Sequence, residues 1–437
     1  MSNLKPYPKY KPSGVEWLGD VPEGWETKKL SHWFDAYGSG TTPPNEADYS
    51  DSGTPWVTTG ELRENTIFST DKRVTQKAIA SYSALKVHPA DSLVIAMYGA
   101  TVGRIGRLGI PATLNQACFA IHPNDLISLD LLEYWFQGFR DELITLATGA
   151  GQPNISGDKI KTLLVSAPID SNEQSAIATF LDRETTRIDS LVEKKQRFIE
   201  LLKEKRQALI TDAVTGKFDV STGKPYPAYK PSGVEWLGDV PECWGIKPFF
   251  AQTMERKEPN KGMIETNLLS LSYGRIVPKD INTDEGLLPA SFETYQLIHP
   301  NDIVFRLTDL QNDKRSLRSA ICKEKGIITS AYLAVRTSGF DADYLNYLMR
   351  SYDVMKVFYS MGGGMRQSMK FDDLKRLPLI VPSVREQTAI VTFLDGETTR
   401  IDSLMEKTEK SIELLKERRS ALITAVVTGK IDVRDAA

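Results

Sequence analysis

Two segments of the chain combine arginine with amide and hydroxyl side chains. Residues 305–325 hold six basic residues against three acidic ones, and residues 98–106 (YGATVGRIG) carry an arginine among three glycines. An arginine can donate two hydrogen bonds to one guanine edge or grip a phosphate, and a side-chain amide matches an adenine edge. The chemistry that these residue types favour is nucleic-acid recognition rather than bond cleavage.

The candidate nucleic-acid contacts lie in these two segments, in LNQA (residues 114–117), and in two glycine-rich segments, GAGQPNIS (149–156) and GGGMRQSMK (362–370). They are Tyr98, Thr101, Arg104, Arg107, Asn115, Gln116, Gln152, Asn154, Arg306, Gln311, Asn312, Lys314, Arg315, Ser316, Arg318, Arg366 and Gln367. The first arginine segment contains no acid from residue 99 to residue 116, and its glycines would allow close backbone approach. A plain glycine-rich hairpin, a solvated loop or flexible linkage would have the same composition, so these alternatives stay open.

Signatures of catalysis are missing from the sequence. It contains no GxGxxG, GxxxxGK[ST], GxSxG or HExxH, and no Asp/Asn-Pro-Pro-aromatic motif of an amino-methyltransferase. The two TGK triplets (215–217 and 428–430) follow predicted helices and lack the upstream glycine of a phosphate loop, so they indicate helix ends. Cys118, Cys243 and Cys322 are far apart. We expect no catalytic residue, no metal and no cofactor in this chain.

Composition gives a broader frame. The chain has 437 residues, 54 Lys+Arg against 57 Asp+Glu, 41% hydrophobic and 25% charged residues. This is typical of a folded soluble protein of roughly two to four structural units. No apolar run approaches the length of a membrane span, and the first residues lack the apolar core of a signal peptide. We therefore expect a cytoplasmic protein without a membrane partner.

Two segments of the sequence occur twice. Residues 5–25 return at 224–244 with 19 of 21 positions identical, and residues 173–220 return at 386–433 with 35 of 48 identical. Between the copies lie two inserts, residues 26–172 and 245–385, that share almost no continuous identity. Repeated segments around unlike inserts predict two domains of one fold with different surfaces.

The repeat also predicts the domain organisation. Joining the C-terminal TGKIDV to the N-terminal KPYPKYKPSG nearly regenerates the internal linker, so we expect a pseudo-two-fold cyclic repeat with its two ends close together. The predicted parts are an N-terminal repeat segment (1–25), a first insert domain (26–172), a spacer helix (173–213), a linker with the second repeat segment (214–244), a second insert domain (245–385), and a C-terminal spacer helix with its tail (386–437).

The longer repeat reads as a helix. Asn172 is a fair N-cap and Gly216 a stop, and apolar residues recur at steps of three and four, which is the pattern of a paired helix. Polar residues such as Lys195 and Thr408 interrupt the stripe. The residues predicted to join the helices to each other or to a partner are Ile188, Leu191, Phe198, Leu202, Leu209, Ile401, Leu404, Leu415 and Leu422.

Each insert mixes short strands with helices. TPWVTT, SLVIAMYG, CFAIHP and KTLLVSAP predict strands in the first, and NLLSLSYG, DIVFRLTD and SAYLAVRT in the second. DLLEYWFQGFRDELITLATG and DYLNYLMRSYDVMKVFYSMGGG predict helices. The predicted fold class is α+β: two mixed α/β domains separated by two long, antiparallel, coiled-coil-like helices.

This organisation resembles the specificity subunit of type I restriction–modification enzymes. The resemblance covers essentially the whole chain, and it is carried by PSGVEWLG…PE-x-W (12–25 and 231–244), by EQ-x-AI-x-TFLD-x-ETTRID (173–189 and 386–402), and by YGATVGRIG with LNQA in the first insert. It implies a non-catalytic reader of double-stranded DNA in which each insert is a target-recognition domain for one half of a bipartite asymmetric site.

The same resemblance implies partners. The helices would set the spacing and hold two modification (methyltransferase) subunits, which would bind S-adenosylmethionine and flip the target adenine. Restriction (motor-nuclease) subunits, with ATP and magnesium, would join outside them. Alternatives are a specificity subunit of a related fused or Bcg-like system, an enzyme with its own hidden nuclease or methylase activity, and a coiled-coil adaptor that binds only proteins.

Overall fold

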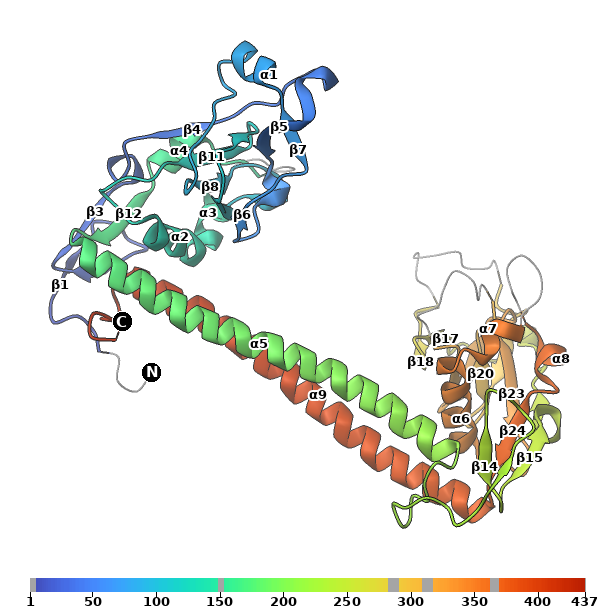
Figure 1. The fold of residues 1–437 in the computed structure, drawn as a ribbon. Helices are drawn as coiled ribbons and strands as arrows, with labels where there is room; N and C mark the ends of the chain where they lie inside the picture. Colours follow the sequence, from blue (N-terminus) through green and yellow to red (C-terminus); the bar gives the residue numbers. More distant parts are fainter. Residues whose placement is uncertain (1–4, 148–152, 282–290, 309–316, 362–368, 437) are drawn as a thin grey trace. The chain divides into compact units, whose positions relative to one another are not determined.

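A computed structural model describes residues 5–147, 153–281, 291–308, 317–361 and 369–436 (Figure 1). Its contacts divide the chain into two compact units. Unit 1 is Met1–Gln196 with Lys410–Ala437, and unit 2 is Arg197–Glu409. Among the described residues, no helix is long and apolar enough to cross a membrane.

Unit 1 is built from short strands and helices in the order of the first insert. Its strands are β1 (Tyr10–Pro12), β2 (Asp20–Pro22), β3 (Trp25–Lys29), β4 (Tyr37–Ser39), β5 (Tyr49–Val57), β6 (Thr66–Ile67), β7 (Lys72–Val74), β8 (Leu93–Ala96), β9 (Ile105–Leu108), β10 (Thr113–Leu114), β11 (Cys118–Ile121) and β12 (Leu164–Pro168). Its short helices are α1 (Gln76–Ser81), α2 (Leu129–Gly138), α3 (Arg140–Leu146) and α4 (Gly157–Lys161). The main sheet has the order β4-β11-β8-β9-β6, with β10-β5-β7 as a second sheet and β12-β3 as a ribbon.

Unit 2 repeats this plan with a different set of loops. Its strands are β13 (Tyr229–Pro231), β14 (Asp239–Pro241), β15 (Gly245–Pro248), β16 (Thr253–Glu255), β17 (Leu269–Ser272), β18 (Arg275–Pro278), β19 (Gln296–Ile298), β20 (Ile303–Phe305), β21 (Ser319–Ile321), β22 (Gly326–Ile328), β23 (Leu333–Thr337) and β24 (Pro378–Val381). Its short helices are α6 (Ala342–Val354), α7 (Val357–Met361) and α8 (Phe371–Leu374). The order β16-β23-β20-β21 matches β4-β11-β8-β9 of unit 1, and β15-β24 matches β3-β12.

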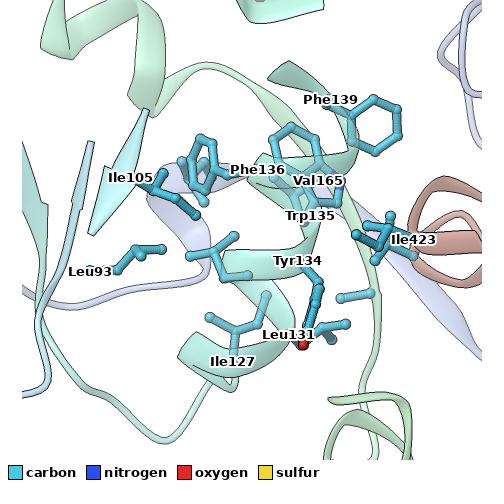
Figure 2. Packing of buried hydrophobic residues seen from close by; sticks show 14 of the residues in the cluster. Leu93, Ile105, Ile127, Leu131, Tyr134, Trp135, Phe136, Phe139, Val165 and Ile423 are labelled. Carbon is cyan, nitrogen blue, oxygen red and sulfur yellow. The ribbon is translucent and has the colours of Figure 1, made fainter. Parts of the chain in front are cut away.

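Every strand predicted from the sequence lies on an observed strand, and each predicted insert helix is broken once. The first divides at Phe139 into α2 and α3, and the second divides near Lys356, whose φ is +64°, into α6 and α7. The helices bury their apolar faces against the main sheet. Figure 2 shows this core in unit 1, where Trp135, Phe136 and Phe139 of the α2 region pack among Leu93, Ile105 and Ile423.

The helices α5 (Ser171–Val214) and α9 (Val384–Val427) are long, and each contributes residues to both units (Figure 1). The first part of α5 and the last part of α9 belong to unit 1, and the remaining parts belong to unit 2. In unit 1, Arg183 contacts Ala436 and Asp189 contacts Arg419, while in unit 2 Arg206 contacts Asp402 and Phe218 contacts Phe393. Partner numbers fall as α5 numbers rise, so the paired halves run antiparallel in each unit.

The predicted N-cap of the first long helix is wrong by two residues. α5 begins at Ser171, and the Asn172 N–H donates to the Asp170 carboxylate at 2.9 Å, so Asp170 takes the capping role. The helix ends as expected. Gly216 has a φ of +74°, and the Lys217 N–H donates to the Asp212 carbonyl at 2.9 Å, which satisfies the last turn.

Burial on the long helices follows a different phase from the predicted stripe. The inward positions of α5 are Leu181, Thr185, Ile188, Val192, Lys195, Ile199, Leu202, Arg206, Leu209 and Ala213, and those of α9 are the same positions plus 213. We call these the core row. The steps still alternate between three and four, but Leu191, Phe198 and Leu404, predicted as pairing residues, are 40%, 44% and 38% exposed. Val192, Ile199 and Met405 take the inward places.

Candidate nucleic-acid interface

The two arginine segments found in the sequence are the same loop of the fold. In unit 1, residues 97–104 connect β8 to β9, and the Ala96 N–H donates to the Arg104 carbonyl at 2.8 Å at the base of the loop. In unit 2, residues 306–318 connect β20 to β21, and the Arg306 N–H donates to the Arg318 carbonyl at 2.8 Å. Both hairpins sit at the same place in the sheet order, so Arg104 and Arg318 are structural equivalents.

The later glycine-rich segments join these loops. The Ile155 N–H donates to the Met97 carbonyl at 2.9 Å in unit 1, and the Met369 N–H donates to the Leu307 carbonyl at 2.9 Å in unit 2. In unit 1, Tyr98 and Asn154 also form a β-bridge. In unit 1, segments predicted separately therefore form one surface, and in unit 2 the described ends of the two segments, Leu307 and Met369, lie side by side.

In unit 1 this surface carries five of the predicted side chains. Tyr98, Thr101 and Arg104 lie on the hairpin loop, Asn154 is exposed beside it, and Gln116 is exposed on the adjacent turn, where the Met97 N–H donates to the Ala117 carbonyl at 2.8 Å. Thr101 donates its hydroxyl to the Tyr98 carbonyl at 2.8 Å, which fixes the loop. Arg104 is half-buried, and no ion pair joins it to an acid within the part of the chain that the structure describes. Its guanidinium suits a phosphate or a guanine.

The neighbouring amides already hold protein groups. The Asn115 side-chain oxygen accepts from the Ala117 N–H at 3.1 Å, and the Gln116 side-chain oxygen accepts from the Thr42 hydroxyl at 2.5 Å. Their NH₂ groups are the atoms left for a nucleic acid. Thr42 was not identified from the sequence, and because it is 74 positions from Gln116 no local pattern could have indicated it.

The structure removes Arg107 from this surface. Its guanidinium lies 2.5 Å from the Asp130 carboxylate and 4.0 Å from Glu133, and its side chain is only 18% exposed. Burial raises the pKa of Glu133, and the charge of Arg107 opposes that rise. The sequence showed no acid near Arg107 because both acids come from α2. Arg107 fastens α2 to β9 and is not available for DNA.

In unit 2, Arg318 is a second correction. It is fully buried, donates through its guanidinium to the Thr308 carbonyl at 3.1 Å, and donates its N–H to the Asp353 carboxylate at 2.7 Å. A side chain in that position supports the base of the loop and cannot reach a base pair. Arg306 is half-buried at the same base. The remaining predicted contacts lie outside the described residues: Gln152, Gln311, Asn312, Lys314, Arg315, Ser316, Arg366 and Gln367.

Both inserts are held on the long helices by matching polar contacts, which the sequence did not reveal. The Tyr134 hydroxyl donates to Asp182 at 2.6 Å, and the Tyr347 hydroxyl donates to Asp395 at 2.7 Å. Burial, followed by the bond to Asp395, raises the pKa of Tyr347 to about 12, so it stays a donor at neutral pH. Both partners of the second bond are the first pair plus 213. The offset of 213 between the two helix repeats thus also relates positions in inserts of unlike sequence. This offset was the sequence signal that could have indicated the two contacts.

Two further contacts repeat at the helix starts. Gln174 accepts from the Ser128 N–H at 2.6 Å, and Gln387 accepts from the Asp341 N–H at 2.9 Å. The indoles of Trp25 and Trp244 donate to Glu173 and Glu386 at 2.8 and 2.9 Å. We refer to these three kinds of bond together as the docking contacts. Unlike inserts therefore sit on their own helix ends in the same way.

Among the described residues, no group of three or more His, Cys, Asp and Glu side chains could hold an ion. The geometry of unit 1 offers hydrogen-bond donors on a loop surface, an arrangement that could bind a nucleic acid.

The comparisons with known proteins agree with that geometry. Residues 22–201 match the family model described as "Type I restriction modification DNA specificity domain". Over 96% of its length the chain is 22% identical to 96% of the type I restriction enzyme MjaIX specificity subunit of Methanocaldococcus jannaschii. The chain is thus similar in sequence to the type I restriction specificity subunits, and the family match lies in its first 201 residues.

Solved structures are similar to this chain in fold. One chain from a study of complex assembly and conformational transition of the type I R-M system covers 93% of it, with a TM-score of 0.63 and 14% identity. The HsdS subunit from Thermoanaerobacter tengcongensis covers 94%, with a TM-score of 0.55 and 13% identity. The similarity in sequence to specificity subunits supports the role of a DNA sequence-specificity subunit.

Proposed function

We propose that each insert of this specificity subunit reads one half of a bipartite, asymmetric DNA target. The observation that carries the proposal is the repetition of the docking contacts beneath inserts of different sequence. A modular reader requires contacts to the helices that stay the same and a DNA-facing surface that differs between the inserts. In unit 1, Tyr98, Thr101, Arg104, Asn115, Gln116 and Asn154 are the proposed contacts.

The second part of the proposal concerns the cyclic repeat. Lys5 and Asp432 form an isolated backbone β-bridge in unit 1, and Lys224 and Asp219 form the equivalent β-bridge in unit 2. The hydroxyl of Tyr10 donates to the Gly429 carbonyl at 3.0 Å, and that of Tyr229 donates to the Gly216 carbonyl at 3.1 Å. The N-terminal segment thus closes on the end of α9 as the internal linker closes on the end of α5. These contacts support a pseudo-two-fold molecule in which an antiparallel, coiled-coil-like helix pair separates two recognition domains.

The third part assigns the long helices to partners. Four leucines at matching repeat positions point outward from the core row: Leu191 and Leu414 in unit 1, and Leu404 and Leu201 in unit 2. We call them the outer leucines. Apolar residues exposed at equivalent places suit two copies of one partner. We assign them to two modification subunits, with restriction subunits joining outside.

In this account the cofactors belong to the partners: S-adenosylmethionine to the modification subunits, ATP and magnesium to the restriction subunits. The subunit itself would be non-catalytic and would act in the cytoplasm on double-stranded DNA. A related fused or Bcg-like system would use the same recognition surfaces.

Sequencing of methylated adenines in a strain that carries the complete complex tests the proposal. It predicts one split motif with a fixed number of unread base pairs between its halves. A binding series of the complex on random duplex DNA at increasing salt separates a reader from a protein-only adaptor, because phosphate contacts give a steep salt dependence. Salt-independent binding, or no binding, would favour the adaptor.

A further inference from the structure

A hairpin in unit 2 that no sequence motif pointed to carries an exposed tyrosine at its tip. β17 and β18 pair from Leu269 with Pro278 to Ser272 with Arg275, so Tyr273 and Gly274 alone form the turn. Tyr273 is 76% exposed, more than any other large apolar or aromatic side chain among the described residues. The segment Leu269–Pro278 contains no acidic residue.

The turn holds Tyr273 in a conformation that tyrosine seldom adopts. The φ angles of Tyr273 and Gly274 are +46° and +73°, as in a type I′ turn, where asparagine followed by glycine is the preferred pair. A bulky residue at positive φ is unusual and costs stability, and such positions cluster at functional sites. Folding alone would therefore select asparagine at position 273.

The two faces of the hairpin differ. Leu269 and Leu271 are buried, whereas Ser270, Ser272 and Arg275 share the other face, because Ser272 pairs with Arg275 and side chains alternate along each strand. This outward face presents two hydroxyls and one guanidinium. A two-stranded ribbon fits the major groove of B-DNA, where such groups can bind base edges and phosphates.

The tip is braced against the loop already placed in the interface. The Arg350 guanidinium donates to the Gly274 carbonyl, and a Cβ atom at Gly274 would lie 2.7 Å from the Cβ of Leu317. Leu317 belongs to the loop that connects β20 to β21. Burial, Arg206 and Arg275 lower the pKa of Arg350, while Tyr347 and Asp402 oppose that shift, so Arg350 lies near two further cations, of which Arg206 is paired with Asp402. A polyanion against this face would relieve that repulsion.

We propose that the β17–β18 hairpin is a DNA-contacting ribbon of the second recognition domain, in which Tyr273 touches a base pair in the groove and Arg275 binds a phosphate. The inference rests on the proposed function, and it adds a part of the half-site reader that lies outside the arginine segments.

Two substitutions at the tip test this with the chain assembled with its modification subunits. The DNA probe is a 40-base-pair duplex pool, selected from random sequence on the wild-type complex, beside the unselected pool. Tyr273→Asn places the preferred residue in the turn, so the melting temperature should stay unchanged or rise. Affinity for the selected pool should fall roughly 5- to 100-fold, as for one lost base contact. Arg275→Ala should weaken binding to both pools and lower the salt slope by about one.

Phe250→Asn is the matched control. Phe250 is also an exposed aromatic residue of unit 2, but it precedes β16, which pairs with the end of β23 farthest from the loop that connects β20 to β21. It should bind both pools like the wild type. Equal affinity of wild type and Tyr273→Asn for the selected pool would overturn the inference and leave the proposed function standing. A wild-type complex that selects no sequence would overturn the proposed function, and the inference with it.

Discussion

Arg206 on α5 donates to Asp402 on α9 at 3.0 Å, although 196 positions separate the two residues in the sequence. The repeat offset carries this pair onto Asp189 and Arg419, which are also 3.0 Å apart. The two ion pairs therefore mark the same register in the two units. Because each arginine belongs to the core row, this register is selected by charge as well as by apolar contact.

The surroundings of the two arginines differ, and this predicts a difference in stability. Arg206 lies near the half-buried cation of Arg350, whereas Arg419 also donates to Gln137 at 3.4 Å. Removal of Arg206 relieves a repulsion that removal of Arg419 does not. Both pairs are partly exposed, so each is worth about 0.5–1 kcal/mol. In urea unfolding, we expect Arg419→Ala to lower the unfolding free energy more than Arg206→Ala. Equal losses would mean that Arg350 does not influence Arg206.

The outer leucines predict the stoichiometry of assembly. Leu201→Asp with Leu404→Asp should remove the partner held by unit 2, and Leu191→Asp with Leu414→Asp should remove the partner held by unit 1. Light scattering of each purified complex should then give a mass with one modification subunit in place of two. Glu200→Lys with Glu413→Lys, also on exposed helix positions, is the control and should retain both. Retention of two subunits by both leucine variants would show that the partners bind elsewhere.

Leu202 and Leu415 would be a poor choice for that test. Leu202 is buried in the core row and Leu415 packs against the core of unit 1. An aspartate at either place would separate the helices themselves. We expect Leu202→Asp to cost roughly 2–5 kcal/mol of stability, as for loss of a buried leucine, with a lowered melting temperature whether or not a partner is present.

A contact between buried His88 and half-buried His122 predicts a pH dependence for unit 1. The Nδ1 atom of His88 lies 2.9 Å from the Nε2 atom of His122, and burial, with a contribution from His122, lowers the pKa of His88 to about 4. Burial also lowers the pKa of His122. The unfolded chain therefore binds protons between about pH 6.5 and 4 that the fold does not, and stability falls as the pH falls through that window. The loss is up to about 3 kcal/mol.

Thermal unfolding at pH 7 and pH 5 measures this effect. His88→Gln should reduce the difference between the two melting temperatures, whereas His32→Gln, at an exposed position, should preserve it. An undiminished difference in the His88 variant would assign the pH dependence to other groups.

The sequence predicted the framework of this protein well because the repeat constrains it. Two nearly identical segments had to fold alike, and period 3.5 had to pair the helices. The phase within that period could not be read, since Leu191 and Val192 are both apolar and only the partner helix decides which is buried. Three of the nine predicted pairing residues lie on the surface, and two of them, Leu191 and Leu404, now serve the partner hypothesis.

The site was harder to predict because exposure and pairing are tertiary properties. Arg104, Arg107 and Arg318 look alike in sequence. Arg104 lies on the hairpin loop, and Arg107 is neutralised by Asp130 and Glu133 from α2. Arg318 is buried beneath its own loop. Tyr273 escaped notice because NLLSLSYGRI reads as an ordinary strand. Only the backbone angle and the exposed fraction distinguish it.

The proposed spacing role of the helices can be tested by lengthening both. Duplicating residues 193–199 and 406–412 adds one heptad to each helix and leaves the core row in phase. Each helix grows by about 10.5 Å, roughly three base-pair steps. Methylation at the original spacing should be lost, and any motif that remains should have the same two halves with a longer gap. Methylation of the unaltered motif would show that the helices do not set the spacing.

The most direct measurement exchanges one insert and sequences the methylated adenines. Residues 245–385 would be replaced by the second insert of another specificity subunit, with Gln387 and Asp395 kept for the docking contacts and Tyr347 and Asp341 supplied by the graft. The account predicts a split motif in which one half and the gap are unchanged and the other half is new. A motif altered in both halves, or one without a gap, would contradict it.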